Sequence, residues 1–142
     1  EEVRAAVAGC RKADAEMPVV STMTFDTKGR TMMGTTPAQA IQALSELGVI
    51  ALGANCGNGP AEIEGVIDSM HTTQPDTILI AKANAGLPHM HDDVAVYDAT
   101  PDAMAQYARR ALELGARVIG ACCGSTPDHI RAIATAIQEK TS

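Results

Sequence analysis

Two adjacent thiols, Cys122 and Cys123, lie between a predicted strand and a predicted helix. The strand is the β-branched run at residues 117–121. A helix start follows, with Thr126 as the capping hydroxyl, Pro127 at the first helical position and an acid in the first turn. We therefore expect the thiols at the carboxyl end of a strand. In α/β barrels and open α/β sheets, this end of the strands carries the active site.

A third cysteine, Cys56, stands in a similar setting because the chain repeats itself. Residues 47–60 and 114–127 both read as a helix stop, a short strand, a Cys-Gly-x-x-Pro turn and a helix start. We expect Cys56 and Cys123 at equivalent heights in the fold. Three thiolates from two strand ends can hold a tetrahedral zinc ion at ~2.3 Å per Zn–S bond, with the fourth position open. Such a site suits alkyl transfer to sulfur, since the metal lowers the pKa of a bound thiol but leaves the thiolate nucleophilic.

The residues alone leave three other interpretations of the cysteines open. All four could be small core side chains, because free cysteine is among the most buried residue types. Their glycine-flanked loops argue against this. Cys122 and Cys123 could form a redox pair, although adjacent cysteines close a strained ring and the chain has no C-x-x-C. The Cys-Gly-Ser-Thr-Pro turn could bind an anion at a helix N-terminus, which would leave the thiols unused.

Two asparagines, Asn55 and Asn84, fall in the expected strand-end loops. Either could orient a cysteine ligand or bind substrate. Each could equally be a turn asparagine that satisfies its own backbone.

The histidines carry weaker signals. His89 and His91 form an H-x-H that could bind a metal, but the two acids that follow them are typical of a solvated loop. His71 and His129 fall near helix ends and receive no role.

Composition predicts one globular domain with a small-molecule function. The chain has 142 residues, 46% hydrophobic and 20% charged, so it can bury a core. Aromatic residues make up only 2%, and 11 Lys and Arg are scattered over a chain of net charge -6, so no nucleic-acid partner is expected. No apolar run approaches the ~20 residues of a membrane span. Without a secretory signal we expect a cytoplasmic protein, in which thiols stay reduced.

Hydrophobic periodicity and turn residues predict an opening helix followed by four strand–helix units. The opening helix runs to about Ala13, with Cys10 on its apolar face as ordinary core. Helices begin at the caps Thr36 and Thr100, at Pro60 and after Thr126. The predicted strands are residues 19–25, 49–52, 77–82 and 117–121.

Two connections stand out in this pattern. Residues 53–59 read as a loop, and residues 83–99 form a long connection without a clear period, which is more often functional than filler. Four consecutive βα units with right-handed crossovers are half of an eight-unit barrel, which typically needs about 250 residues. The chain is too short to close one.

Three stretches resemble a known family. They are GANCG at residues 53–57, NAGLP at 84–88 and GACCGSTPDHI at 120–130. They resemble, in order, the three late signatures of the zinc-dependent homocysteine S-methyltransferases. This family includes betaine-homocysteine methyltransferase, S-methylmethionine-dependent enzymes and the homocysteine domain of cobalamin-dependent methionine synthase, all of them (β/α)₈ barrels.

The resemblance implies that residues 1–142 are the C-terminal half of a homocysteine-binding (β/α)₈ domain. It implies that Cys56, Cys122 and Cys123 bind Zn²⁺, with no further catalytic side chain. The parent protein would transfer a methyl group from a small donor to homocysteine, in methionine biosynthesis. Ala121 and Ser125 stand where the family often has Gly and Thr.

The resemblance also implies that the first four βα units are absent, so the chain alone should not form a complete site. Self-association or a complementary half-barrel is the expected partner. The methyl donor stays open, because donor contacts in this family lie largely outside this stretch. The alternative function is a non-catalytic zinc-binding half-barrel fragment or subunit.

Overall fold

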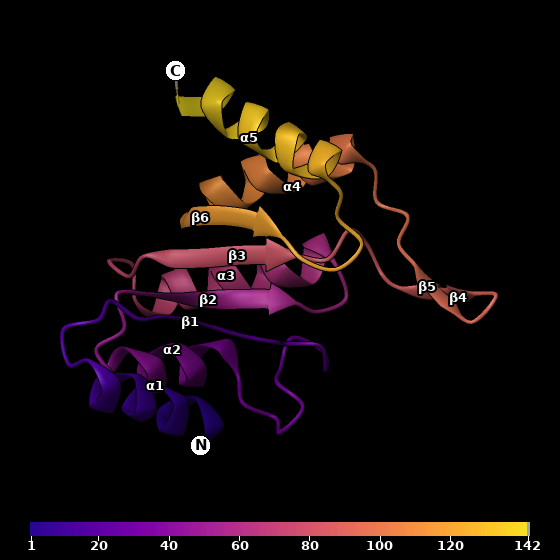
Figure 1. The fold of residues 1–142 in the computed structure, drawn as a ribbon. Coiled ribbons are helices and arrows are strands. Elements are labelled where there is room, and N and C mark those ends of the chain that lie inside the picture. Colours follow the sequence, from indigo (N-terminus) through magenta and orange to yellow (C-terminus); the bar gives the residue numbers. More distant parts are fainter. Residues whose placement is uncertain (142) are drawn as a thin grey trace.

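In a computed structural model, which describes residues 1–141, four parallel strands form one sheet in the order β1-β2-β3-β6. The strands are β1 (Val20–Met23), β2 (Ala51–Cys56), β3 (Leu79–Ala83) and β6 (Ala116–Ala121). The helices are α1 (Glu2–Ala13), α2 (Pro37–Ser45), α3 (Pro60–Thr73), α4 (Pro101–Glu113) and α5 (Pro127–Thr141). The predicted α/β class with a parallel sheet is confirmed. All four strands pair in parallel, and the arrows of β2, β3 and β6 point the same way in Figure 1, so the carboxyl ends share one edge.

The helices begin where the sequence places them. Thr36 and Gln39 form the predicted capping box at α2. Thr100 accepts a hydrogen bond from the Ala103 amide at 3.2 Å at the start of α4. Proline occupies the first turn of α2, α3 and α4, where a missing N–H costs nothing.

The hydrophobic core lies between the helices and one face of the sheet. Leu52, Leu79 and Ala81 point to this face and are at most 1% exposed. They pack with the apolar side of α3, which lies behind β2 and β3 in Figure 1. That side consists of Ile63, Val66, Ile67 and Met70.

The opposite face of the sheet is partly open. Register partners in a parallel sheet share a face, and Gly53, Ile80 and Val118 are partners across three strands. Val118 is 48% exposed on β6, and Val20 on β1 is 56% exposed. Apolar side chains therefore remain accessible on this face at both edges of the sheet.

Strand β2 corrects one prediction. Residues 53–59 read as a loop, whereas β2 continues through Gly53 to Cys56. The segment is flanked by β1 and β3, and pairing on both sides outweighs the low strand propensity of glycine and asparagine. A β-carbon on Gly53 would overlap the backbone of Ile80, so only glycine allows this approach.

The long connection at residues 83–99 contains an antiparallel hairpin that the sequence pattern did not predict. Its strands are β4 (His89–His91) and β5 (Val94–Val96). Asp92 and Asp93 between them have φ of 48° and 61°, which fits a two-residue type I′ turn. This hairpin, called the arm below, extends beyond the carboxyl edge of the sheet (Figure 1). Within residues 1–141, no helix is both long and apolar enough to cross a membrane.

Candidate metal centre

The thiols of Cys56, Cys122 and Cys123 come together at the carboxyl edge of the sheet. All three sulfurs lie within 4.8 Å of one another. The Cys56 and Cys122 sulfurs are 2.9 Å apart, and those of Cys122 and Cys123 are 3.9 Å apart. This group could hold a metal ion, and within the described residues it is the one cluster of His, Cys, Asp and Glu side chains with that geometry. Cys10 lies on α1, outside the cluster.

Backbone geometry delivers the sulfurs to this edge. Cys56 ends β2 with φ of 59°, and Gly57 follows at 67°, so the chain turns sharply as the strand ends. A non-glycine residue in this region is uncommon and is frequently found at functional sites. On the other side, the Cys122 amide donates to the Ala83 carbonyl oxygen at 2.8 Å. This bond continues the β3–β6 pairing up to the thiols.

Asn84 joins two turns, the Cys56 turn (residues 56–59) and the double-cysteine turn (residues 122–126). Its Nδ2 donates to the Gly57 carbonyl oxygen at 2.8 Å, and its Oδ1 accepts from the Cys123 amide at 3.1 Å. The residue is 5% exposed, and its bond to Gly57 is buried while that from Cys123 is partly buried. Asn84 thus sets the distance between the two turns, and the predicted substrate contact stays a prediction.

Asn55 contacts one of the candidate ligands directly. Its Nδ2 donates to the Cys56 sulfur at 3.1 Å and lies 3.2 Å from the Thr24 hydroxyl oxygen. A donor pointing at sulfur stabilises the thiolate over the thiol. The geometry therefore supports the ligand-orienting interpretation of Asn55, and its substrate role stays a prediction.

The thiols influence one another's protonation. Burial raises the pKa of Cys56, but hydrogen bonds from Cys122, Asn55 and Cys123 outweigh burial, so the pKa of Cys56 falls below its ordinary value. Burial and the hydrogen bonds with the other two thiols raise the pKa of Cys122 to about 11. Cys56 is therefore the first of this pair to become a thiolate.

Two neighbours of the thiols were missed by the sequence reasoning. Lys82 is in register with Asn55 and Gly120 at the carboxyl end of β3, and its positive charge helps to lower the pKa of Cys56. Tyr97 follows the arm, and its ring lies where a β-carbon of Gly124 would stand. Burial and the nearby thiols, Cys123 foremost, raise the pKa of Tyr97. Strand parity could have indicated Lys82, whereas no local pattern marks Tyr97.

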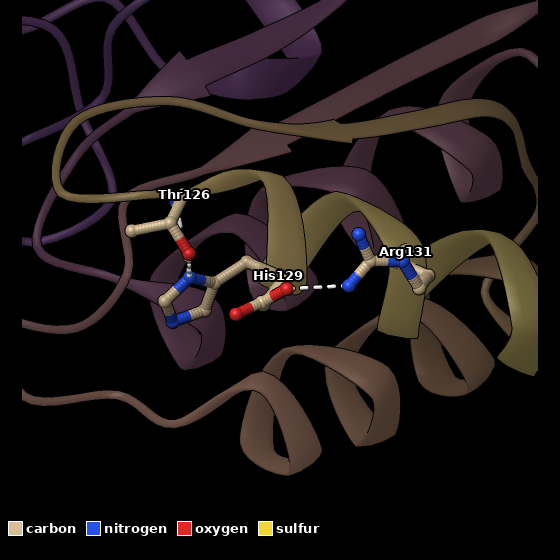
Figure 2. A network of polar contacts seen from close by, with 4 residues as sticks. Thr126, His129 and Arg131 are labelled. Atoms are coloured by element: carbon tan, nitrogen blue, oxygen red, sulfur yellow. Dashed lines mark hydrogen bonds and ion pairs between the residues drawn. The ribbon is translucent and has the colours of Figure 1, made fainter.

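His129 also has a place that the sequence did not assign. It is 8% exposed at the start of α5, and its ring faces Thr126 in Figure 2. Nδ1 lies 2.8 Å from the Thr126 hydroxyl oxygen. The ion pair between Asp128 and Arg131 in the same view is exposed and contributes little. His89 and His91 lie on the exposed arm.

Comparison with known proteins adds the family. The family model for homocysteine S-methyltransferase matches residues 1–137. The chain belongs to the homocysteine S-methyltransferase family. It is 36% identical over 143 aligned positions to the methionine synthases of Mycobacterium leprae and Mycobacterium tuberculosis, covering 96% of this chain and 12% of theirs.

Solved structures show the same fold. The apo form of the homocysteine methyltransferase MmuM from Escherichia coli superposes with a TM-score of 0.71 at 22% identity, covering 94% of this chain and 45% of that one. Its metallated form gives 0.69 at 23% identity, covering 93% and 40%. This family member therefore spans less than half of the solved chains that it resembles, and about an eighth of the two methionine synthases.

Proposed function

We propose that this chain carries the metal ligands of a homocysteine S-methyltransferase, and that the parent protein methylates homocysteine to give methionine. The observation that carries the proposal is the convergence of Cys56, Cys122 and Cys123 at the carboxyl edge of the sheet. Family membership and relatives named methionine synthase support homocysteine as the substrate.

The donor set fits Zn²⁺. Tetrahedral coordination at ~2.3 Å per Zn–S bond places the sulfurs about 3.8 Å apart. The Cys122–Cys123 separation of 3.9 Å already matches this spacing. The Cys56–Cys122 pair, at 2.9 Å, would open by about 1 Å to reach it. Three soft ligands favour zinc over magnesium or calcium, which prefer oxygen.

Zinc bound here would act as a Lewis acid that lowers the pKa of the substrate thiol. The chain's own residues hold the ligands in place, with Asn55 on the Cys56 sulfur and Asn84 between the two turns. In the overall reaction the homocysteine thiol loses its proton, the sulfur forms a bond to the methyl carbon, and the donor leaves with the electron pair of its broken bond. No protein nucleophile is needed.

The four cysteines are free, which supports a reducing, cytoplasmic location.

The same proposal implies that four further βα units pair with this sheet and close an eight-unit barrel. The consecutive parallel order, the exposed Val20 and Val118, and a fold match to 45% of a longer chain all support this. Unpaired edges and an apolar face favour association. The isolated chain should therefore self-associate or bind its other half. A single monomeric species at micromolar concentration in sedimentation, with cooperative unfolding, would contradict the half-barrel.

The second candidate is a zinc-binding fragment or subunit without turnover of its own. The observation that favours it is the short coverage of the relatives, 12% of each methionine synthase. Zinc content and methyl transfer to homocysteine, measured with and without the complementary half, separate the two candidates. Zinc without activity under both conditions supports the second.

X-ray absorption of the zinc-loaded protein with both halves present tests the first candidate. Homocysteine should replace a light-atom neighbour of zinc by a fourth sulfur. An unchanged coordination shell at saturating homocysteine would refute the proposed function, whatever the zinc content.

A further inference from the structure

A ring of hydrogen bonds joins the double-cysteine turn to the base of the arm. The Ala85 amide donates to the Cys123 carbonyl oxygen at 2.9 Å, and the Ala99 amide donates to the Ala85 carbonyl oxygen at 3.0 Å. His129 Nε2 lies 2.8 Å from the Ala99 carbonyl oxygen. Its Nδ1 lies 3.0 Å from the Thr126 amide nitrogen. The backbone from Cys123 to Thr126 closes the ring.

These contacts require one tautomer of His129. The Thr126 amide can only donate, so Nδ1 must accept, and Nε2 must carry the proton that the Ala99 carbonyl oxygen accepts. Both ring nitrogens are therefore occupied by backbone groups of two separate segments, at Thr126 and at Ala99, which lies 30 positions before His129. A side chain with one acceptor and no donor could not make both contacts.

The start of α2 shows what capping alone requires. There Gln39 Oε1 accepts from the Thr36 amide at 2.9 Å and lies 3.1 Å from the Thr36 hydroxyl oxygen. His129 Nδ1 has the same relation to Thr126 at α5. The second nitrogen of His129 is not needed for the cap, and it is this nitrogen that contacts Ala99.

The hydrogen bond from His129 Nε2 to the Ala99 carbonyl oxygen, called the tether below, also reaches the thiols through Tyr97. Tyr97 lies two residues before Ala99, and its ring packs over Gly124, where φ of 78° and the missing β-carbon leave room for it. Gly124 directly follows Cys123, so the Tyr97 ring lies beside the turn that carries this thiol. The base of the arm thus contacts the turn through the Tyr97 ring on Gly124 and through the His129 bond to Ala99.

We propose that His129 is a positioning residue: its Nε2–H holds Ala99, and through it Tyr97, against the double-cysteine turn, so that the Tyr97 ring stays on Gly124 next to Cys123. The link to metal binding rests on the proposed function, whereas the tether itself does not.

Three substitutions distinguish the tether from the cap, which is the hydrogen bond that Nδ1 accepts from the Thr126 amide at the start of α5. His129→Asn keeps an acceptor near the Thr126 amide but has no donor at the position of Nε2. His129→Gln offers an acceptor and a donor about as far apart as the two ring nitrogens, so it should restore both contacts. His129→Ala removes both.

Hydrogen exchange of single amides in the metal-free chain is the first readout. In His129→Asn and His129→Ala, the Ala85 and Ala99 amides should exchange at least tenfold faster, and in His129→Gln they should stay near the wild-type rate. Each exchange rate is divided by that of the Leu52 amide, which donates to the Ile78 carbonyl oxygen at 3.1 Å in the core. A loss of global stability changes both rates and therefore cancels from the ratio. Unchanged relative rates for Ala85 and Ala99 in the Asn and Ala variants would overturn the tether.

Zinc affinity by chelator competition is the second readout. His129→Asn should weaken zinc binding about tenfold, the low end for outer partners of metal ligands, and His129→Gln should restore it. Equal zinc affinity in all variants would refute the link to the thiols. If the wild-type chain binds no zinc, the proposed function fails, while the exchange rates still decide the tether.

Discussion

The turn after Cys56 and the turn after Cys123 share the order Cys-Gly-x-x-Pro, and in each the residue six places after the cysteine folds back onto its own turn. In the first turn, Glu62 accepts from the Asn58 amide at 2.8 Å and from the Gly29 amide of the preceding loop at 3.2 Å. In the second turn, His129 accepts from the amide of Thr126 and contacts the carbonyl oxygen of Ala99.

The difference teaches how a repeated scaffold is adapted to its neighbours. Both residues occupy the third position of a helix, from which a side chain reaches back to the preceding turn. The backbone group that faces each side chain then determines which residue type fits there. An amide, at Gly29, needs an acceptor, and a carboxylate supplies one. A carbonyl, at Ala99, needs a donor, and imidazole can accept and donate at once.

The largest expected effect tests whether both turns supply metal ligands. Cys56→Ser, Cys122→Ser and Cys123→Ser should each lower zinc affinity by orders of magnitude, because the proposed site has these three thiolates as its protein ligands. Cys10→Ser on α1 is the matched control and should bind zinc normally. Full zinc occupancy in both Cys56→Ser and Cys123→Ser, measured by metal analysis, would contradict the prediction that both turns supply metal ligands.

Alkylation of the metal-free chain should separate the two turns by pH. Because the pKa of Cys122 is raised to about 11 and that of Cys56 is lowered, Cys56 should react first as pH rises. Two pKa units mean about 100-fold less thiolate for Cys122 at pH 8 than for an ordinary cysteine. Mass spectrometry of the labelled peptides measures the order. Cys122→Ala, which removes the donor at this position, should raise the pKa of Cys56 and slow its labelling if the Cys122 thiol is the stabilising donor.

Asn84 and Asn55 should differ because one bridges the turns and the other serves a single turn. Asn84→Ala leaves the Gly57 carbonyl and the Cys123 amide without their buried partner, which costs roughly 1–3 kcal/mol and about 10- to 100-fold in zinc affinity. Asn55→Ala removes one donor from the Cys56 sulfur. It should weaken zinc binding less and raise the pH at which Cys56 is alkylated. An equal loss of zinc affinity in the two variants would contradict the bridging role.

The smallest effect concerns the two equivalent glycines. Gly57→Ala and Gly124→Ala both force φ near 70–80° on alanine, at about 1 kcal/mol. At Gly57 the added carbon meets the flexible end of Glu62 at 2.9 Å, whereas at Gly124 it overlaps the Tyr97 ring. Urea unfolding should therefore show a loss about 1–3 kcal/mol greater for Gly124→Ala. Equal losses would mean that Tyr97 is not fixed on the turn.

Much of the fold follows from local signals in the sequence. The caps at Thr36 and Thr100 and the prolines after them mark helix starts, and the structure confirms them. The end of β2 could not be predicted this way, because Gly53 and Asn55 have low strand propensity and become strand only through pairing with β1 and β3. The arm was missed because its turn residues are Asp92 and Asp93, where asparagine–glycine would have been the stronger signal.

By itself, the sequence determined the order of the helices and of the four parallel strands, though not the hairpin β4–β5, and the arrival of three cysteines at the carboxyl ends of those strands. Both depend on interactions between near neighbours along the chain, and parallel strands share one edge by geometry. Only the tertiary structure decided how Asn84 bridges the turns, where Tyr97 lies and which tautomer His129 adopts. The partners that distinguish them lie 27 to 39 positions away, and such pairings are set by packing rather than by any local pattern.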